Sequence, residues 1–213
     1  MLPSSVSDTP TGGPGRANRE IPAIVRRMMR THTWIATTGG PHLLIADEEL
    51  QHWRGIDRWH DYGNPADQSD YGRACRVTTW LGSIACHQRS AVVLSGDAGD
   101  MAWYSNGLGD RGFLVQWLGV DNERLIEPAL RVPQLRELLE SSNAERLEFE
   151  TGASGAMWLI DASDRGYDLR SEHEVLALRP GSYLARAAYY HSTGLAIVVR
   201  EICWISPLSN EVR

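Results

Sequence analysis

Short apolar runs separated by turn-forming residues follow one another from residue 34 to the end of the chain. The runs contain β-branched and aromatic residues and are bounded by Gly, Asp, Ser and Asn, which is typical of β-strands. They predict strands over residues 41–46, 81–87, 90–95, 112–118, 156–161 and 195–201. The last run is apolar at almost every position, so we expect it to be buried on both faces, at the centre of its sheet.

Helix signals are fewer than strand signals, and they predict helices over residues 48–54, over residues 123–126 and after Pro133. Asp47 has the side chain of an N-cap for the first helix, and Gly55 stands where a helix often ends. After Pro133, a favoured first-turn residue, leucines recur at helical spacing over about three turns.

A turn is predicted over residues 179–182, whose sequence is Arg-Pro-Gly-Ser. Proline fixes φ at the first central position of a turn, and glycine supplies the positive φ that a type II turn requires at the second. Apolar residues flank this turn over residues 176–178 and 183–187. The pattern predicts a β-hairpin in which the two flanking segments pair.

Composition and internal similarity predict the domain organisation. Residues 1–31 begin with a Ser-, Pro- and Gly-rich stretch and end with a short basic segment, so we expect a disordered or loosely helical extension. A single β-rich domain is predicted over residues 32–206, with a tail over residues 207–213. Similar segments recur in its two halves, residues 32–120 and 145–206, which a helical segment joins. These patterns predict a mostly β fold (β-rich α+β) of two packed antiparallel β layers with a few short helices, and they raise an internal duplication as its origin.

Composition supports a folded domain and limits its partners. Of the 213 residues, 42% are hydrophobic and 23% are charged, which is enough for a sizeable core. The formal charge of −6 disfavours nucleic-acid binding, which needs a basic surface, and suits association with a basic protein. The three cysteines are widely spaced and odd in number, as is typical of the reducing cytoplasm. No segment has the length and apolarity of a membrane span, so we expect a cytoplasmic protein without a membrane partner.

Side chains of the metal-ligand type gather in one predicted loop and beside it: His52, Asp57, His60, Asp61, Asp67 and Asp70. Their spacing matches no metal-site motif, so we expect a solvated loop with no metal and no cofactor. Cys75 and Cys86 are expected to be small core residues. Because Cys86 and His87 are adjacent in a predicted strand, their side chains point to opposite faces and cannot act as nucleophile and base. We therefore expect no catalytic residues.

A compact motif begins at Asp70 and ends at Cys75. In one interpretation, Asp70 and Arg73 form a charged rim for a partner, beside Tyr71. In the other, Asp70 caps a turn, Arg73 pairs with a carboxylate, and Ala74 and Cys75 enter the core. Both interpretations stay open from the sequence, and we favour the second.

An ordered series of motifs carries the strongest functional signal. It consists of Trp34, Gly39-Gly40-Pro41, Leu50-x-x-Trp53-x-Gly55, Asp70-Tyr71-x-Arg73-Ala74-Cys75, a strand containing Gly82, Val92-Val93-Leu94 with Gly96-Asp97, and Phe113-x-Val115-x-Trp117. In this order the motifs resemble those of bacterial immunity proteins that protect a cell from its own polymorphic toxin, specifically the immunity protein 21 family. The resemblance covers residues 34–205 and is strongest over residues 34–117.

The resemblance implies a non-enzymatic immunity protein that binds a cognate toxin domain and occludes it. Aromatic rings with polar handles are frequent at protein interfaces, and the chain has eight Trp and seven Tyr. The predicted toxin-binding residues are aromatic anchors ringed by acids: Trp53, Trp59, Asp61, Tyr62, Asp67, Asp70 and Tyr71, and in a second group Asp97, Asp100, Trp103 and Tyr104. A different class stays open, namely a small-molecule-binding β domain or an enzyme whose site is assembled from distant segments.

Overall fold

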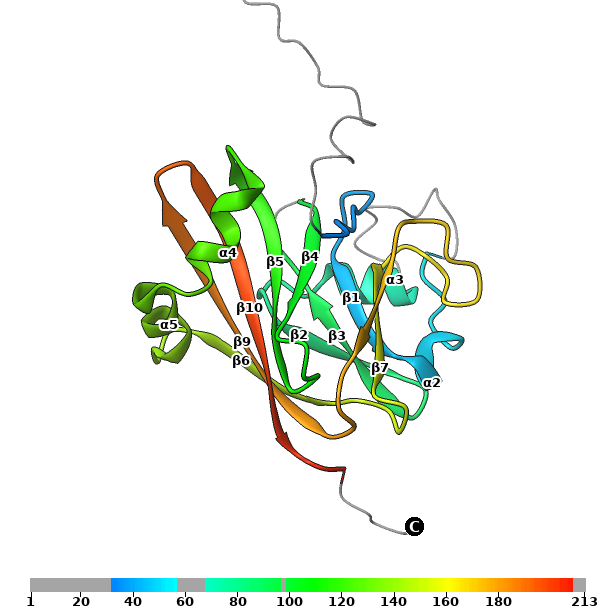
Figure 1. The fold of residues 1–213 in the computed structure, drawn as a ribbon. Coiled ribbons are helices and arrows are strands. Elements are labelled where there is room, and N and C mark those ends of the chain that lie inside the picture. Colours follow the sequence, from blue (N-terminus) through cyan, green and yellow to red (C-terminus); the bar gives the residue numbers. More distant parts are fainter. Residues whose placement is uncertain (1–31, 57–67, 97–98, 209–213) are drawn as a thin grey trace, which may run out of the picture. The chain divides into compact units, whose positions relative to one another are not determined.

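Two packed β-sheets make up the fold. The structure is a computed structural model that describes residues 32–56, 68–96 and 99–208. Across these ranges, ten strands form two antiparallel sheets of five, as Figure 1 shows. Sheet I has the order β2 (Gly82–Cys86), β3 (Arg89–Leu94), β1 (His42–Ala46), β7 (Ala156–Asp161) and β8 (Glu174–Ala177). Sheet II has the order β4 (Met101–Ser105), β5 (Arg111–Val120), β10 (Leu195–Ser206), β9 (Ser182–Ser192) and β6 (Glu145–Glu150). The predicted mostly β fold of two antiparallel layers is confirmed.

The helices of the described residues are short and connect or cover the strands. They are α2 (Asp47–Leu50), α3 (Asp70–Cys75), the 3-10 turn η2 (Glu123–Leu125), α4 (Ile126–Ala129) and α5 (Pro133–Glu140). As predicted, α5 begins at Pro133, although it is eight residues long and so shorter than expected. Within the part of the chain that the structure describes, no helix is both long enough and apolar enough to cross a membrane.

The predicted helix over residues 48–54 is wrong in its bounds. Helix α2 begins at Asp47, with Ala46 at the N-cap position, and it ends at Leu50. The chain then turns because Trp53 enters the core, where its indole Nε1 donates a hydrogen bond to the carbonyl of Ala162 at 3.0 Å. Gly55 has a φ of +61°, the left-handed conformation that glycine adopts most easily, and so ends this turn rather than a helix.

The main core lies between the two sheets. Leu44 and Val92 of sheet I are buried in one cluster with Leu114 and Ile202 of sheet II. The outer face of each sheet is covered separately. On sheet I, Tyr71 and Ala74 of α3 pack with Leu43 and Ile45 of β1, so β1 is buried at all five positions. On sheet II, the cover is formed by α4 and α5, which lie beside β9 and β10 in Figure 1.

Strands from distant parts of the chain meet at the centre of both sheets. In sheet II, β10 pairs with β5 on one side and β9 on the other, as expected from its apolar sequence. In sheet I, β1 pairs with β3 and with β7, which follows more than a hundred residues later. Each sheet therefore combines strands from residues 32–120 and 145–206. The internal duplication and the domain boundaries stay predictions.

The predicted hairpin around residues 179–182 is wrong. Strand β8 pairs with β7 in sheet I, whereas β9 pairs with β10 and β6 in sheet II. The turn residues therefore carry the chain from one sheet to the other. Gly181 has a φ of +155°, and Tyr183 donates its hydroxyl to the carbonyls of Arg179 and Gly109, both at 2.8 Å, which fixes this crossing. The Pro-Gly sequence is compatible with a hairpin turn, but the apolar faces of β8 and β9 pack in different sheets.

Candidate functional site

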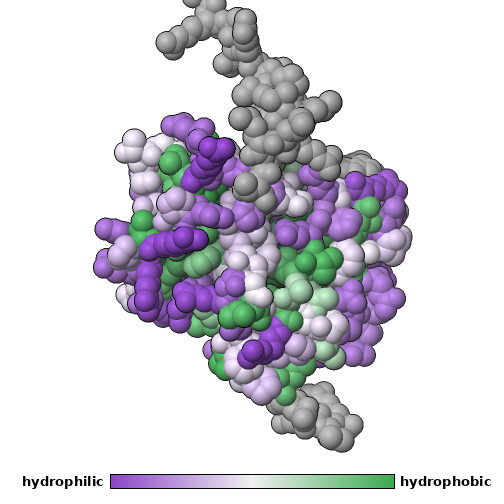
Figure 2. All heavy atoms as spheres, in the orientation of Figure 1, coloured by the Kyte–Doolittle hydropathy of each residue, from purple (hydrophilic) through white to green (hydrophobic). Residues whose placement is uncertain are grey.

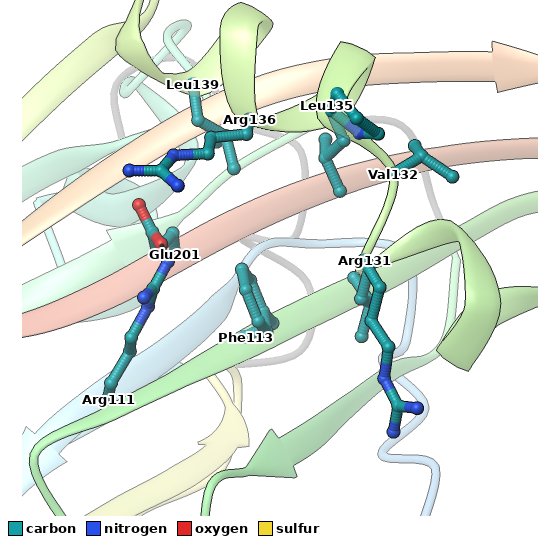
Figure 3. Close-up of a pocket in the computed structure, with 10 residues that line it drawn as sticks. Arg111, Phe113, Arg131, Val132, Leu135, Arg136, Leu139 and Glu201 are labelled. Atoms are coloured by element: carbon teal, nitrogen blue, oxygen red, sulfur yellow. Dashed lines mark hydrogen bonds and ion pairs between the residues drawn. The ribbon is translucent and has the colours of Figure 1, made fainter.

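A groove of about 320 Å³ lies between α5 and the outer face of sheet II. Its lining, drawn in Figure 3, combines apolar and arginine side chains: Arg111, Phe113, Leu130, Arg131, Val132, Pro133, Leu135, Arg136, Leu139 and Glu201. We call it the arginine groove. Figure 2 shows the same character at lower detail, with strongly hydrophilic residues interspersed with hydrophobic ones on the side of the molecule that carries α5.

Helix α5 forms one wall of the groove because its sequence is amphipathic. Leu135 and Leu139 are buried and stand four residues apart, so both face sheet II. Arg136 and Glu140 are also four residues apart, on the exposed side, and Arg136 Nε donates to Glu140 Oε1 at 2.9 Å. Pro133 fixes the first turn without a side-chain cap at Val132. The wall is therefore apolar below and charged at its rim.

The floor of the groove comes from β5, where side chains alternate between the two faces of sheet II. Leu114 and Gln116 point to the inside of the fold, whereas Phe113 packs with the apolar cluster under α4 and α5. Arg111 lies two residues before Phe113, so it reaches the same outer face, and its guanidinium lies 5.8 Å from the centre of the Phe113 ring. The spacing on one strand thus places a cation and an aromatic ring side by side.

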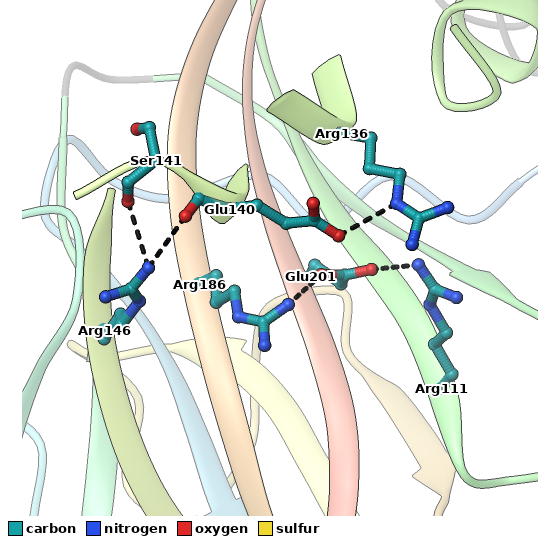
Figure 4. A network of polar contacts seen from close by, with 7 residues as sticks. All are labelled: Arg111, Arg136, Glu140, Ser141, Arg146, Arg186 and Glu201. Atoms are coloured by element: carbon teal, nitrogen blue, oxygen red, sulfur yellow. Dashed lines mark hydrogen bonds and ion pairs between the residues drawn. The ribbon is translucent and has the colours of Figure 1, made fainter. Parts of the chain in front are cut away.

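A buried carboxylate organises the charges at one end of the groove. Only 4% of the Glu201 side chain is exposed, and it forms ion pairs with Arg111 and, at 3.3 Å, with Arg186 (Figure 4). An unpaired carboxylate in this position would carry a large desolvation cost, so the two guanidinium groups are required partners. Glu201 in turn holds Arg111 and Arg186 over the face of sheet II.

A further arginine closes the end of α5. Arg146 Nη2 on β6 donates to the carbonyls of Glu140 and Ser141, both at 3.0 Å (Figure 4). These carbonyls lie at the C-terminus of the helix, where backbone acceptors have no partner within the helix and a cation is favourable. Arg146 therefore fixes α5 against the sheet and keeps the groove wall in place.

Four of the six predicted aromatic anchors lie in the core of the structure. Trp53, Tyr71, Trp103 and Tyr104 are each no more than 8% exposed, so in this structure their rings pack inside the protein rather than presenting a surface to a partner. Trp53 packs in the apolar cluster on the outer face of sheet I, where its indole N–H is satisfied by the carbonyl of Ala162, and Tyr104 packs edge-on against Trp34. Asp100 is half-buried at the start of β4. Five of the predicted residues lie outside the described residues: Trp59, Asp61, Tyr62, Asp67 and Asp97.

The structure agrees with the structural interpretation of the motif from Asp70 to Cys75 in its ion pair and in the burial of Ala74, but not in its cap or in Cys75. Asp70 forms an ion pair with Arg73 and accepts a hydrogen bond from the backbone N–H of Arg54 at 2.8 Å. The cap of α3 is Ser69, whose hydroxyl accepts from the N–H of Gly72 at 3.0 Å, and not Asp70 as predicted. Cys75 is exposed and not part of the core, because it is at the end of α3, on the side away from sheet I.

The described cysteines and histidines that were considered as nucleophile, base or metal ligand show no catalytic arrangement. Cys86 is buried as expected, and burial raises the pKa of its thiol to about 11, which disfavours the nucleophilic thiolate. His87 stacks on His52 with the ring centres 3.8 Å apart. Within the described ranges, no group of three His, Cys, Asp or Glu side chains is arranged to hold a metal ion. The predicted ligand-type residues Asp57, His60, Asp61 and Asp67 lie outside these ranges.

The arginine groove is not predicted by any single sequence motif. Its cations come from β5, from the segment before α5 and from α5 itself. A weak signal is present around Pro133, where Arg131 and Arg136 flank an apolar helix. A second is the alternation of Arg111, Phe113 and Val115 in a predicted strand. Neither signal shows that the two segments meet, since their proximity depends on the fold.

The chain is similar to one known family over most of its length. The family model described as Immunity protein 21 matches residues 33–195, a range that contains every strand of the fold from β1 to β9. No curated protein and no solved structure matches the chain.

Proposed function

Because the chain belongs to the immunity protein 21 family, we propose that it neutralises a cognate bacterial toxin domain by binding it and covering its working surface. The observation that carries this proposal is the family match over residues 33–195, which is supported by a fold that agrees with the expected β layers. Inhibition of this kind needs a stable surface with anchoring side chains and makes or breaks no covalent bond. We therefore propose that the protein is not an enzyme and acts in the cytoplasm of a bacterium.

The proposal is tested by expressing the toxin domain encoded beside this gene in a bacterial host, alone and together with the protein. We expect growth arrest with the toxin domain alone and restored growth on co-expression. We also expect the two proteins to co-purify as a complex of defined stoichiometry. Continued arrest in cells that contain the folded protein, with no complex on purification, would contradict the proposed function.

A second candidate function is the binding of a small anionic molecule. It is favoured by the arginine groove, whose volume of about 320 Å³ is at the lower end of the range for small-molecule sites. The groove also has the apolar floor and the few polar groups that such sites use. Binding of inorganic phosphate by the groove without any effect on toxin affinity would favour this candidate.

A further inference from the structure

We infer that the arginine groove is a contact surface for the toxin and that it binds an acidic segment carrying an apolar side chain. The inference rests on the proposed function, because it names the partner surface for the same inhibitor. It differs from the expectation from the sequence, which placed acidic residues of this protein against a basic partner.

The arginine groove carries an excess of positive charge. The groove and its rim hold Arg111, Arg131, Arg136 and Arg186, whereas the carboxylates that face them are Glu140 and Glu201. The rim thus has more cations than anions, although the whole chain has a formal charge of −6. A local excess of positive charge on an acidic protein favours a negatively charged occupant at this place.

Two arginines of the groove, Arg131 and Arg136, are available to bind a partner. Among the described residues, the guanidinium of Arg131 forms no hydrogen bond and no ion pair, and Arg131 is exposed. Arg136 pairs with Glu140, but three quarters of its side chain is exposed, so solvent screens this pair. Both arginines can therefore bind a carboxylate without breaking a buried interaction. Guanidinium groups bind carboxylates through two parallel hydrogen bonds and are enriched at protein interfaces.

The shape of the arginine groove favours a protein segment over a small anion. In Figure 3, Arg131 lies on one side of Phe113, whereas Arg111 and Arg136 lie on the other. A phosphate or a carboxylate alone needs donors that converge on one point, and these donors are separated by an apolar floor. A peptide segment satisfies both features, because an apolar side chain can rest on Phe113 and Val132 while flanking acids reach the two arginine groups.

The experiment uses isothermal titration calorimetry to compare the affinities of three charge-reversed variants for the toxin domain. The toxin domain is recovered from the co-purified complex. The groove variants are Arg131→Glu and Arg136→Glu. The matched control is Arg170→Glu, since Arg170 is equally exposed, pairs with a neighbouring acid in the same way, and lies between β7 and β8 of sheet I. All three changes alter the net charge equally, so a general electrostatic effect would appear in the control as well.

We expect each groove variant to bind the toxin domain at least about tenfold more weakly than the unmodified protein, with an affinity unchanged in Arg170→Glu. Raising the salt concentration should reduce the difference between the groove variants and the unmodified protein. Far-UV circular dichroism and thermal unfolding of each variant test whether the exposed substitutions leave the fold intact.

Three results would overturn the inference. The first is equal affinity of both groove variants and the unmodified protein, in which case the toxin binds elsewhere and the proposed function stands. The second is that inorganic phosphate stabilises the unmodified protein but not Arg131→Glu, while the affinity of Arg131→Glu for the toxin is unchanged. That result would make the groove a small-anion site. The third is a change in oligomeric state confined to the groove variants, which would make a second copy the occupant. Failure of the unmodified protein itself to bind the toxin would instead contradict the proposed function.

Discussion

Adjacent charged residues on β10 serve opposite faces of one sheet. Arg200 points inward, where it donates to the carbonyl of Trp80 at 3.0 Å, to Gln116 Oε1 at 3.1 Å and to the carbonyl of Ser95. Burial lowers the pKa of Arg200 to about 9. Glu201 points outward and holds the arginines of the groove. Because side chains alternate along a strand, two neighbouring residues connect the sheets on one side and organise the groove on the other.

His42 is the buried residue for which we expect the clearest pH dependence. Its Nε2–H donates to the carbonyl of Ile35 at 2.8 Å, and Nδ1 has no hydrogen-bond partner among the described residues. Burial lowers the pKa of His42 from 6.5 to about 4. In the unfolded chain the imidazole takes up a proton below its ordinary pKa, whereas the folded protein resists it, so stability falls as the pH decreases from about 7 to about 4.

The shift corresponds to a loss of roughly 3 kcal/mol in the free energy of unfolding over that range, and this residue adds no further loss below it. Urea unfolding at several pH values measures the slope. We expect a flatter slope in His42→Gln, in which this group cannot titrate, and an unchanged slope in His191→Gln, because His191 is exposed on β9. Parallel slopes in the unmodified protein and His42→Gln would contradict this assignment.

At the scale of a single element, β5 contains a matched pair of glycines. A side chain at Gly112 would overlap the indole ring of Trp103, which is buried across the strand pair on β4. A side chain at Gly119 would meet only the Cβ of Ala196, at 3.9 Å. Neither glycine has a positive φ, so the two differ in the space around them and not in backbone conformation.

We therefore expect Gly112→Ala to lower the free energy of unfolding by about 2 kcal/mol, because overpacking a core is unfavourable. Gly119→Ala should leave stability unchanged or raise it by up to ~1 kcal/mol, since alanine has less conformational freedom to lose. Urea unfolding followed by tryptophan fluorescence gives both values. Equal effects of the two substitutions would mean that the Trp103 ring can move away at little cost.

The elements that the sequence predicts well are those with a decisive local signal. Strand β10 is apolar on both faces and lies at the centre of its sheet, and α5 begins at its proline. The hairpin over residues 176–187 fails because a Pro-Gly turn fixes a change of direction and not the partner of each strand. Strand pairing depends on which apolar faces meet in the whole fold, and local patterns do not contain that information.

The residues of the candidate site were harder to predict than the strands for a similar reason. An aromatic ring with a polar group suits an interface or a core equally well. Trp53 packs in an apolar cluster on sheet I, and Ala162, more than a hundred residues away, supplies the carbonyl that accepts from its indole N–H. The arginine groove joins Arg111 to Arg131 and Arg136 only after β5 and α5 have packed. Contacts between segments so distant in sequence are a property of the fold.

At the scale of the whole molecule, shared sheets predict cooperative unfolding. Neither residues 32–120 nor residues 145–206 contain a complete sheet, since each sheet takes strands from both. Loss of one half therefore removes partners from both sheets, and we expect a single two-state transition. Coincident urea curves from tryptophan fluorescence and far-UV circular dichroism would agree with this expectation. Two separate transitions would show that the halves fold independently.

The position of β1 and β10 affects how the protein is made. Among the described residues, the first strand to leave the ribosome and the last one are the central strands of the two sheets. A growing chain can pair β1 with β3 once residue 94 has been made, but the other neighbour of β1, β7, follows only at residues 156–161. Sheet II can close only after synthesis has passed residue 206. Folding that waits for such distant pairings is slow compared with helical proteins. The surface that we propose for toxin binding lies on sheet II, so we expect a nascent chain to become able to bind only after β10 has been made.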